Sequence, residues 1–439
     1  MVGLGATGLS CARYFHARGL PFAVVDTRSE PPGIEQLRSE MPDVRVFAGD
    51  YPEDVFAGAS EIVVSPGIAM DAPIVAAALA AGAAIVGDID LFVREARAPV
   101  IGITGSNAKS TVTELLGRMA RDTKLDVGVG GNLGTPALDL LASERDLYVL
   151  ELSSFQLERA GALDLAVATV LNISEDHLDR HGNMVGYHQA KHRIFRGCNT
   201  AVVNRDDRLT IPLLPADVEV VSWRMAEPEL GGFGLRMEEG VEFLCHGFEN
   251  LLPVAQMGLV GRHNMANALA ALALGHSVGL PMDVMINTLR SFKGLPHRCE
   301  LVAELRGVRF VNDSKGTNVG ATEAALEGLG GTRDILLIAG GQSKGADFSQ
   351  LRRAVQTHCR LLVLIGEDAA LLEEALAQSV PVVNACSMKE AVGLAVEQAV
   401  AGDCVLLSPA CASFDMFSGY VARGEAFCAA VADIGEGGE

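Results

Sequence analysis

The strongest chemical signal in the sequence is a polar run that ends in a lysine, a serine and a threonine. The apolar segment Pro99–Thr104 precedes the run, and a helical pattern over Val112–Ala120 follows it. In this context, backbone N–H groups at a helix N-terminus can hold phosphates, while Lys109 binds the outer phosphates. The hydroxyl of Ser110 or Thr111 is then available to Mg²⁺. The run therefore predicts a phosphate loop, although a helix cap with a surface lysine is an alternative that the same residues allow.

The glycines of this loop depart from the usual pattern. Ile103 and Ala108 stand where the motif G-x-x-x-x-G-K-[ST] has glycines. We expect Ala108 to adopt ordinary helical dihedral angles in the first turn of the helix, where alanine loses less conformational entropy than glycine. The substitution Ala108→Gly should then leave catalysis nearly unchanged. The expected loop residues are Gly105, Ser106, Asn107, Ala108, Lys109, Ser110 and Thr111.

Other polar residues also follow apolar strands directly. Glu151 comes after the apolar segment Leu147–Leu150, where a carboxylate suits Mg²⁺ held against phosphates. A solvated charge at a strand end is the alternative for this residue. His177 follows the predicted strand Ala166–Asn172, and it is the histidine of its region that we expect to be functional. The cluster Asn312–Asn318 ends a further apolar strand, so it either lines a site or caps a helix.

A glycine-rich turn lies at the start of the sequence. Gly3, Gly5 and Gly8 are followed, after a helix and a strand, by Asp26. This spacing is typical of a dinucleotide fingerprint, in which glycines form a tight turn and the carboxylate binds a ribose or a base. NAD, a nucleotide diphosphate and a tight turn in a Rossmann-like domain stay open as interpretations. The strand expected before the turn is almost absent from the sequence.

Composition limits the class of protein. The chain has 439 residues, 49% hydrophobic and 21% charged, which predicts about two to four globular domains, with three as the central expectation. The 35 Lys and Arg residues against 55 Asp and Glu residues give a net charge of -20, which opposes binding to nucleic acid or to anionic lipid. We therefore expect no nucleic-acid partner and no membrane partner.

Hydropathy and cysteine usage both indicate the cell compartment of the protein. The longest uncharged apolar stretch, Ala72–Gly87, is shorter than the roughly 18 residues that a membrane span requires. The nine cysteines include no zinc-like C-x-x-C pair, and the N-terminus lacks the basic region and apolar core of a signal peptide. These features predict reduced thiols and a cytoplasmic protein.

Short β-branched segments alternate with Ala- and Leu-rich segments that have helical spacing. The predicted strands are Phe22–Asp26, Glu61–Ser65, Pro99–Thr104, Leu147–Glu151, Ala166–Asn172, Asp334–Ala339, Leu361–Gly366 and Cys404–Ser408. This alternation predicts βαβ units and buried, mainly parallel sheets, and therefore an α/β fold. Turn and loop motifs along the sequence predict domains at 1–87, 88–293 and 294–439. The stretch Glu219–Leu259 of the second domain is predicted to form antiparallel strands.

A set of motifs, present in this order along the chain, together resembles the Mur ligase family of peptidoglycan synthesis. The motifs are Thr104–Thr111, Glu151–Gln156, Glu175–Arg180, Gly261–Asn267, Leu295–Arg298, Asn312–Asn318 and Ser408–Phe417. The resemblance covers essentially the whole chain and is closest to the members that join D-glutamate to UDP-N-acetylmuramoyl-L-alanine. It implies a three-domain architecture, with a Rossmann-like UDP-binding domain, a P-loop ATPase-like central domain and a C-terminal Rossmann-like domain.

The resemblance also implies a reaction and its ligands. ATP would phosphorylate the carboxylate of UDP-N-acetylmuramoyl-L-alanine, and the amine of D-glutamate would attack the acyl phosphate. The implied cofactors are ATP and Mg²⁺ at two sites. The implied form is a cytoplasmic monomer in which Lys191 is carbamylated and bears on the second metal ion.

Individual residues receive roles from the resemblance alone. The implied contacts to the UDP substrate are Ala6, Thr7, Asp26, Thr27, Arg28, Gly67, Asn132 and His177. The implied Mg²⁺ ligands are Ser110, Glu151, His177 and carbamylated Lys191. ATP is assigned Asn267, Arg298 and Asp313 in addition to the loop, and D-glutamate is assigned Thr317, Lys344, Ser413 and Phe414. The implied catalytic residues are Lys109, His177, Lys191, Arg298 and Lys315.

Three departures from the family pattern accompany these assignments. Ala108 replaces the usual glycine, Gln342 stands where the nearest members have aspartate, and the first strand is short. We expect Lys344, rather than Gln342, to carry the charge recognition of D-glutamate. Two other functions stay open, namely a folylpolyglutamate synthase-like amide ligase and a non-catalytic nucleotide-binding regulator.

Overall fold

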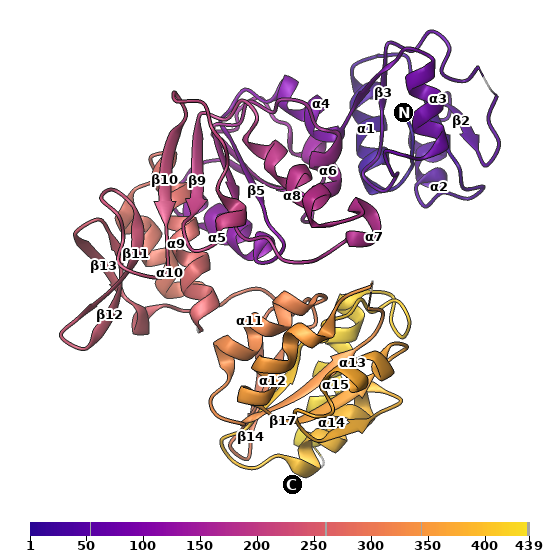
Figure 1. Cartoon of the computed structure of the whole chain (residues 1–439). Coiled ribbons are helices and arrows are strands. Elements are labelled where there is room, and N and C mark those ends of the chain that lie inside the picture. The colour runs from indigo at the N-terminus through magenta and orange to yellow at the C-terminus, as the bar shows by residue number, and fades with distance from the viewer. Residues whose placement is uncertain (53, 260, 344, 437–439) are drawn as a thin grey trace. The chain divides into compact units, whose positions relative to one another are not determined.

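The computed structural model describes residues 1–436 except for residues 53, 260 and 344. The chain forms two compact units (Figure 1). The first unit comprises residues 1–173, 185–255 and 267–289, and the second comprises residues 174–184, 256–266 and those from 290 onward. Among the described residues, no helix has the length and apolar character that crossing a membrane requires.

The first unit begins with short parallel strands around a single residue. Strand β1 (Ala23–Asp26) pairs with β2 (Arg45–Ala48), and β3 (Glu61–Val63) pairs with β4 (Ala84–Val86). Val2 lies between the two pairs and forms parallel bridges with Val25 and Val64. The strand expected before the glycine turn is therefore reduced to one bridge residue. The helices of this region are α1 (Ala6–Ala17), α2 (Ile34–Glu40) and α3 (Pro73–Ala80).

The glycine turn itself depends on close backbone approach. Gly3 has a φ of +92°, and a Cβ atom at Gly8 would overlap the carbonyl oxygen of Gly3. Helix α1 can therefore begin directly after the turn, with Gly5 as its N-cap.

A nine-stranded sheet forms the centre of the first unit, in the order β13-β12-β11-β10-β9-β8-β5-β7-β6. Its strands are β5 (Val100–Thr104), β6 (Val127–Gly131), β7 (Leu147–Glu151), β8 (Val167–Val170), β9 (Thr200–Asn204), β10 (Glu219–Trp223), β11 (Phe233–Glu238), β12 (Val241–His246) and β13 (Glu249–Pro253). The antiparallel prediction is confirmed for β11, β12 and β13. It is wrong for β10, which pairs in parallel with both β9 and β11.

Several helices surround this sheet (Figure 1). They include α4 (Asp88–Glu95), α5 (Lys109–Asp122), α6 (Ser154–Arg159), α8 (Met184–His192), α9 (Arg262–Ser277) and α10 (Met282–Ser291). Helix α5 lies close to β6, because a Cβ atom at Gly117 would be 2.6 Å from the side chain of Val129. Since β5, β7 and β8 are parallel neighbours, their carboxyl ends meet at one edge of the sheet.

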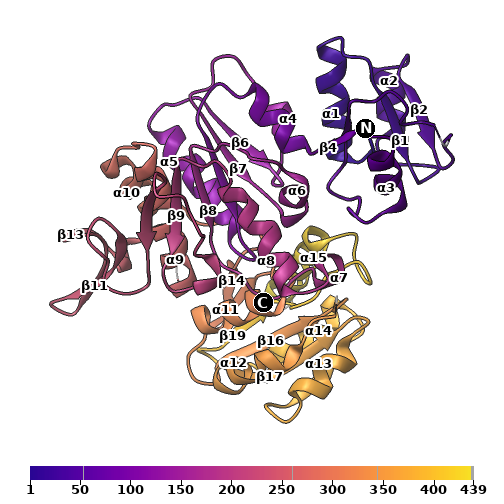
Figure 2. The ribbon, with the colours of Figure 1, turned by 45° about the horizontal axis from the view of Figure 1, so that its top comes forward.

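The second unit contains a six-stranded sheet in the order β14-β15-β19-β16-β17-β18. Its strands are β14 (Glu300–Leu305), β15 (Val308–Asn312), β16 (Ile335–Gly340), β17 (Cys359–Ile365), β18 (Val382–Asn384) and β19 (Cys404–Leu407). Its longer helices are α11 (Val319–Leu329), α12 (Arg352–His358), α13 (Ala369–Leu376), α14 (Met388–Gln398) and α15 (Tyr420–Glu436), and the short α7 (Leu178–His181) also belongs to this unit. Buried side chains place α11, α12 and α13 on one face of the sheet and α14 and α15 on the other (Figure 2). The α/β prediction is confirmed, and each predicted strand corresponds to a strand of the fold.

All nine cysteines are free thiols. Cys386 is exposed and Cys299 and Cys428 are half-buried, while the six others are buried.

Candidate active site

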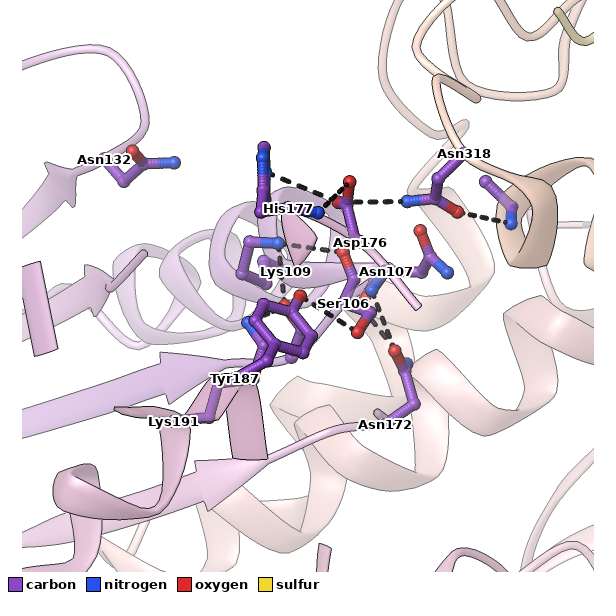
Figure 3. A network of polar contacts seen from close by, with 12 residues as sticks. Ser106, Asn107, Lys109, Asn132, Asn172, Asp176, His177, Tyr187, Lys191 and Asn318 are labelled. Carbon is purple, nitrogen blue, oxygen red and sulfur yellow. Dashed lines mark hydrogen bonds and ion pairs between the residues drawn. The ribbon is translucent and has the colours of Figure 1, made fainter. Parts of the chain in front are cut away.

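The polar run after β5 forms a loop on which two lysines converge. Nζ of Lys109 donates hydrogen bonds to the carbonyl oxygens of Gly105 at 2.8 Å and Ser106 at 2.9 Å (Figure 3). Lys191 of α8 is buried, and its Nζ donates to the same Gly105 oxygen at 2.8 Å. The ring of Tyr187 lies 4.5 Å from Lys191 Nζ, and its hydroxyl lies 3.1 Å from Ser106 Oγ. The loop is therefore held by the two lysines that the sequence analysis selected.

The neighbouring strand end also fixes this loop. The backbone N–H of Asn107 donates to Oδ1 of Asn172 at 2.8 Å, and Nδ2 of Asn172 donates back to the Asn107 carbonyl at 3.2 Å. The backbone N–H of Ser106 donates to the Asn172 carbonyl at 2.9 Å. Ser110 and Thr111 follow at the start of α5 and are buried. The loop between β5 and α5 thus has one defined backbone path.

Ala108 does not have the helical dihedral angles that we expected. It is the N-cap of α5, with φ 66° and ψ −5°, in the left-handed region. For an L-residue this conformation costs roughly 1–2 kcal/mol, because the Cβ atom approaches the following carbonyl oxygen. The prediction of ordinary angles is therefore wrong. The glycine of the usual motif meets a backbone requirement that residue spacing does not reveal.

Glu151 and Asn132 meet at the end of β7. Oε1 of Glu151 accepts a hydrogen bond from Nδ2 of Asn132 at 2.7 Å, and the Glu151 carbonyl accepts one from the Asn132 N–H at 2.8 Å. Glu151 is buried. The carboxylate of Glu151 and the hydroxyl of Ser110 are oxygen donors of the kind that Mg²⁺ prefers. The donor set of the first unit therefore fits this cation.

His177 belongs to the second unit and has a left-handed backbone, with φ 54°. Its N–H donates to Oδ1 of Asp176 at 3.0 Å, and its Nε2 lies 3.5 Å from Oδ2 of the same carboxylate. Nδ2 of Asn318 donates to Asp176 at 3.3 Å, as the dashed lines in Figure 3 show. His177 lines a small pocket with Thr317, Asn318 and Ala410. The structure thus brings together His177 and Thr317, which the resemblance assigned to different substrates.

Asp313 is buried at the end of β15. Its Oδ2 accepts from the Ser408 hydroxyl at 2.8 Å, and its Oδ1 accepts from the Cys299 N–H at 3.2 Å. Burial raises the pKa of Asp313 from 3.8 to about 6, while the Ser408 hydrogen bond and the charge of Arg298 act in the opposite direction. Arg298 and Asp313, both predicted to serve ATP, therefore influence one another.

A buried arginine that the sequence analysis did not select organises this edge of the second unit. Arg423 of α15 is 1% exposed. Its guanidinium donates to the carbonyl of Ser314 at 2.8 Å, to that of Cys411 at 3.1 Å and to that of Ala412 at 3.3 Å. Burial lowers the pKa of Arg423 to about 10, so the side chain is charged at neutral pH. Arg423 therefore joins the loops that follow β15 and β19.

The remaining predicted residues of the second unit differ in their contacts and in their exposure to solvent. Nζ of Lys315 donates to the hydroxyl of Tyr420 at 3.2 Å and lies 4.6 Å from the centre of its ring. Tyr420 is a second residue that the sequence analysis missed. Ser413 is buried, whereas Phe414 is 70% exposed. Lys344 lies outside the described residues.

The acidic residue of the N-terminal fingerprint binds its own chain. Asp26 is buried, and its carboxylate accepts hydrogen bonds from the Leu4 N–H at 2.8 Å and from Nη2 of Arg28 at 2.7 Å. Burial acts to raise the pKa of Asp26, but the hydrogen bonds from Arg28 and Leu4 outweigh it and hold the pKa below its ordinary value. The side chain of Arg28 is 51% exposed. Asp26 therefore orients Arg28, and the guanidinium is the group of this pair that a ligand can reach.

The other predicted UDP-substrate contacts lie at or near strand ends of the same region. Ala6 and Thr7 begin α1, and Thr27 directly follows β1. Ala6, Thr27 and Gly67 are exposed, and Thr7 is half-buried.

Three family models match successive parts of the chain. Residues 1–87 match the N-terminal domain of MurD-like Mur ligases, residues 103–275 the Mur ligase middle domain and residues 297–411 the glutamate ligase domain of Mur ligases. The UDP-N-acetylmuramoylalanine--D-glutamate ligase of Pseudomonas aeruginosa is 53% identical over 436 residues, which cover 99% of this chain and 97% of that protein. This chain belongs to the Mur ligase family. The ligase of the same name from Marinobacter nauticus is 53% identical over 97% of this Mur ligase and 96% of its own length.

Solved structures of two other ligases share the fold of this chain. The pseudomurein peptide ligase type C from Methanothermus fervidus superposes with a TM-score of 0.60 at 19% identity and covers 99% of each chain. The UDP-N-acetylmuramate-alanine ligase from Thermotoga maritima superposes with a TM-score of 0.60 at 17% identity and covers 99% of this chain and 98% of its own.

The selected residues of this Mur ligase fall into two spatial groups. Those of the first unit are the phosphate loop, Asn132, Glu151, Lys191, Asn267 and the N-terminal residues around Asp26. Those of the second unit are His177, Arg298, Asp313, Lys315, Thr317, Ser413 and Phe414.

Proposed function

We propose that this Mur ligase joins D-glutamate to UDP-N-acetylmuramoyl-L-alanine with ATP, in cytoplasmic synthesis of peptidoglycan precursors. The observation that carries the proposal is a defined phosphate loop in a chain that is 53% identical, over 99% of its length, to a D-glutamate ligase. ATP phosphorylates the substrate carboxylate, and the amine of D-glutamate displaces the phosphate from the acyl phosphate.

The first unit supplies positive charge and oxygen ligands. Lys109 is placed at the phosphate loop, where a fixed cation stabilises the charge of the transferred phosphoryl group. Ser110 and Glu151 would hold Mg²⁺, which neutralises phosphate charge when it is bound. In the second unit, Arg298 and Asp313 are proposed to bind ATP. Arg298 and Lys315 are proposed to act in catalysis.

Lys191 is proposed to act as a carbamate. It is 1% exposed and lies against the loop carbonyl of Gly105. Burial disfavours the charged form of an amine, and the neutral amine is the form that adds to CO₂, with loss of one proton. The carbamate replaces a cation with oxygen ligands, which suit a second Mg²⁺.

The domains are proposed to be residues 1–87, 88–293 and 294–439 of a monomer. The N-terminal domain binds the UDP end of the substrate, the central domain binds ATP, and the C-terminal domain binds D-glutamate.

Phosphate release tests the proposed reaction. The protein is incubated with Mg²⁺, ATP, UDP-N-acetylmuramoyl-L-alanine and D-glutamate, with Lys109→Ala as the matched control, and the product is identified by mass. We expect release only with all three substrates, and little release when L-glutamate or L-lysine replaces D-glutamate. Release that is unchanged without D-glutamate would contradict the proposal and favour a nucleotidase or a different ligase.

Recognition of D-glutamate is proposed to depend on Lys344 rather than on Gln342. A charge-assisted hydrogen bond to a carboxylate contributes about 1.5–3 kcal/mol, so Lys344→Ala should raise the KM for D-glutamate roughly 10- to 150-fold. The backbone of Gln342 pairs with Ala412, and its side chain reaches Glu367 at 3.4 Å, so Gln342→Ala should have a small effect. Equal small effects of the two substitutions would remove Lys344 from the site.

A further inference from the structure

A second buried arginine joins the middle domain to the N-terminal domain. The side chain of Arg159, the last residue of α6, is 0% exposed. Its Nη1 donates to the carbonyl oxygens of Val64 at 3.1 Å and Ser65 at 2.7 Å, and its Nη2 donates to those of Pro66 at 3.3 Å and Ile68 at 3.1 Å. One guanidinium thus binds a whole segment of backbone that follows β3.

This pattern fixes the backbone on both sides of Gly67. The carbonyl groups of residues 64, 65, 66 and 68 all turn toward Arg159, and Gly67 lies between the two that Nη2 binds. Gly67 itself is exposed. Because the guanidinium is planar and its donors have fixed directions, one arrangement of these carbonyls satisfies it. Arg159 therefore determines how Gly67 is presented at the surface.

Helix α6 is itself held at the junction between the two domains. Nε2 of Gln156 donates to Oδ2 of the buried Asp88 at 2.9 Å. The N–H groups of Gly161 and Gly87 donate to the carboxylate of Asp90 at 2.8 Å and 2.7 Å. Nε of Arg159 also donates to the carbonyl of Phe155 in its own helix at 2.8 Å. The guanidinium therefore contacts its own helix in the middle domain as well as the backbone of the N-terminal domain.

We infer that Arg159 is a positioning residue for UDP-N-acetylmuramoyl-L-alanine. It holds segment 64–68 so that Gly67 meets the UDP part of the substrate, and it acts through this backbone rather than by touching the substrate. The identity of the substrate rests on the proposed function. The inference predicts a selective loss of affinity for one of the three substrates, because ATP and D-glutamate are assigned to other domains.

Arginine and lysine should differ at this position. A lysine has one ammonium group and cannot reach carbonyls on both sides of Gly67 with fixed geometry. Arg159→Lys should therefore raise the KM for UDP-N-acetylmuramoyl-L-alanine about 10- to 100-fold, which corresponds to the loss of about one charge-assisted hydrogen bond. The KM values for ATP and D-glutamate, and kcat at saturation, should change little. Arg159→Ala should have the larger effect, with partial rescue by added guanidinium ion.

A matched control is available at the strand that precedes segment 64–68. Arg94 of α4 forms a two-point ion pair with Glu61, the first residue of β3, with both contacts at 2.8 Å and side chains that are 46% and 42% exposed. Arg94→Gln removes an arginine link between α4 and the start of β3 but leaves segment 64–68 untouched. The KM for the UDP substrate should then be unchanged.

Calorimetric titration of UDP-N-acetylmuramoyl-L-alanine into each folded variant, without ATP, completes the test. A weaker affinity in Arg159→Lys but not in Arg94→Gln supports the inference. An unchanged affinity, or an equal rise of all three KM values, overturns it. If wild-type protein binds the UDP substrate but shows no turnover dependent on D-glutamate, the proposed function fails while the role of Arg159 is still measured.

Discussion

The strand-end loops of the middle domain and of the C-terminal domain are held by different kinds of residues. In the middle domain, Lys109 and Lys191 both donate to the carbonyl of Gly105, so the lysines proposed to act in catalysis also hold the loop. In the C-terminal domain, the buried Arg423 donates to carbonyl groups of the loops, whereas Lys315 donates to the hydroxyl of Tyr420. Loop structure and charge chemistry are therefore combined in the first region and divided between residues in the second.

This difference determines what a substitution can reveal. Removal of a lysine from the middle domain changes the loop and its charge together, so only an isosteric or charge-matched variant separates the two. In the C-terminal domain, the loop can be loosened through Arg423 without removing the charge of Lys315.

The largest effect is expected at Lys191. Lys191→Ala removes both the loop contact and the proposed carbamate, and Lys191→Arg keeps a cation but cannot be carbamylated. Both variants should lose about 10²- to 10³-fold in kcat, the range seen when one group that stabilises a transition state is removed. Wild-type activity should fall after bicarbonate depletion and return when bicarbonate is restored. A fully active Lys191→Arg variant would show that the ammonium suffices.

Arg423 should affect the C-terminal domain alone. Arg423→Met leaves several buried carbonyl groups without their donor, at about 1–3 kcal/mol for each group left unsatisfied. We expect the free energy of unfolding to fall by at least about 3 kcal/mol and the KM for D-glutamate to rise, while the affinity for ATP falls less than in Lys109→Ala. Urea unfolding and equilibrium binding of ATP measure the two effects. A loss of ATP affinity as large as that of Lys109→Ala would contradict the division of roles between the two regions.

Asp313 should make stability depend on pH. Its pKa is raised from 3.8 to about 6 in the folded chain, so folding favours the protonated form. The resulting stabilisation is fully present below the unfolded value and is lost as the pH rises through about 6. The free energy of unfolding of wild type should therefore decrease more between these two values than that of Asp313→Asn, which does not titrate. Parallel pH profiles of the two proteins, measured by urea unfolding, would refute this assignment.

The smallest effect is expected at Ala108. Ala108→Gly removes left-handed strain of roughly 1–2 kcal/mol but adds about 0.4–1 kcal/mol of unfolded-chain entropy, so the free energy of unfolding should rise by up to about 1.5 kcal/mol. Ala120→Gly, at a buried position in the last turn of α5, should instead destabilise by about 1 kcal/mol. The same sign of change in both variants would show that Ala108 is unstrained.

The strands were predictable because their signal is local. Each alternation of β-branched and Ala-rich segments that the sequence shows corresponds to strands and helices of the fold, and the polar residues at strand ends lie where parallel sheets place them. The direction of β10 was not predictable, because its pattern does not distinguish a parallel neighbour from an antiparallel one.

The residues that hold the loops were not predictable from motifs. Arg159 and Arg423 lie in ordinary helical segments, and their backbone partners on other loops are 91 or more residues away for Arg159 and 83 or more for the Ser314 and Gly340 contacts of Arg423. The angles of Ala108 depend on where the loop must turn, and the pairing of Asp26 with Arg28 depends on the local backbone path. A motif identifies a polar residue but not the group with which that residue forms hydrogen bonds.

The uneven exposure of the thiols offers a way to attach a fluorophore. Maleimides react with accessible thiolates, and Cys386 is exposed just before α14, whereas Cys404 is buried with a pKa raised to about 11 by that burial. Wild-type protein should therefore be labelled first at Cys386, without removal of the other cysteines. A single dye at this position would report in real time how the C-terminal domain responds when nucleotide is added.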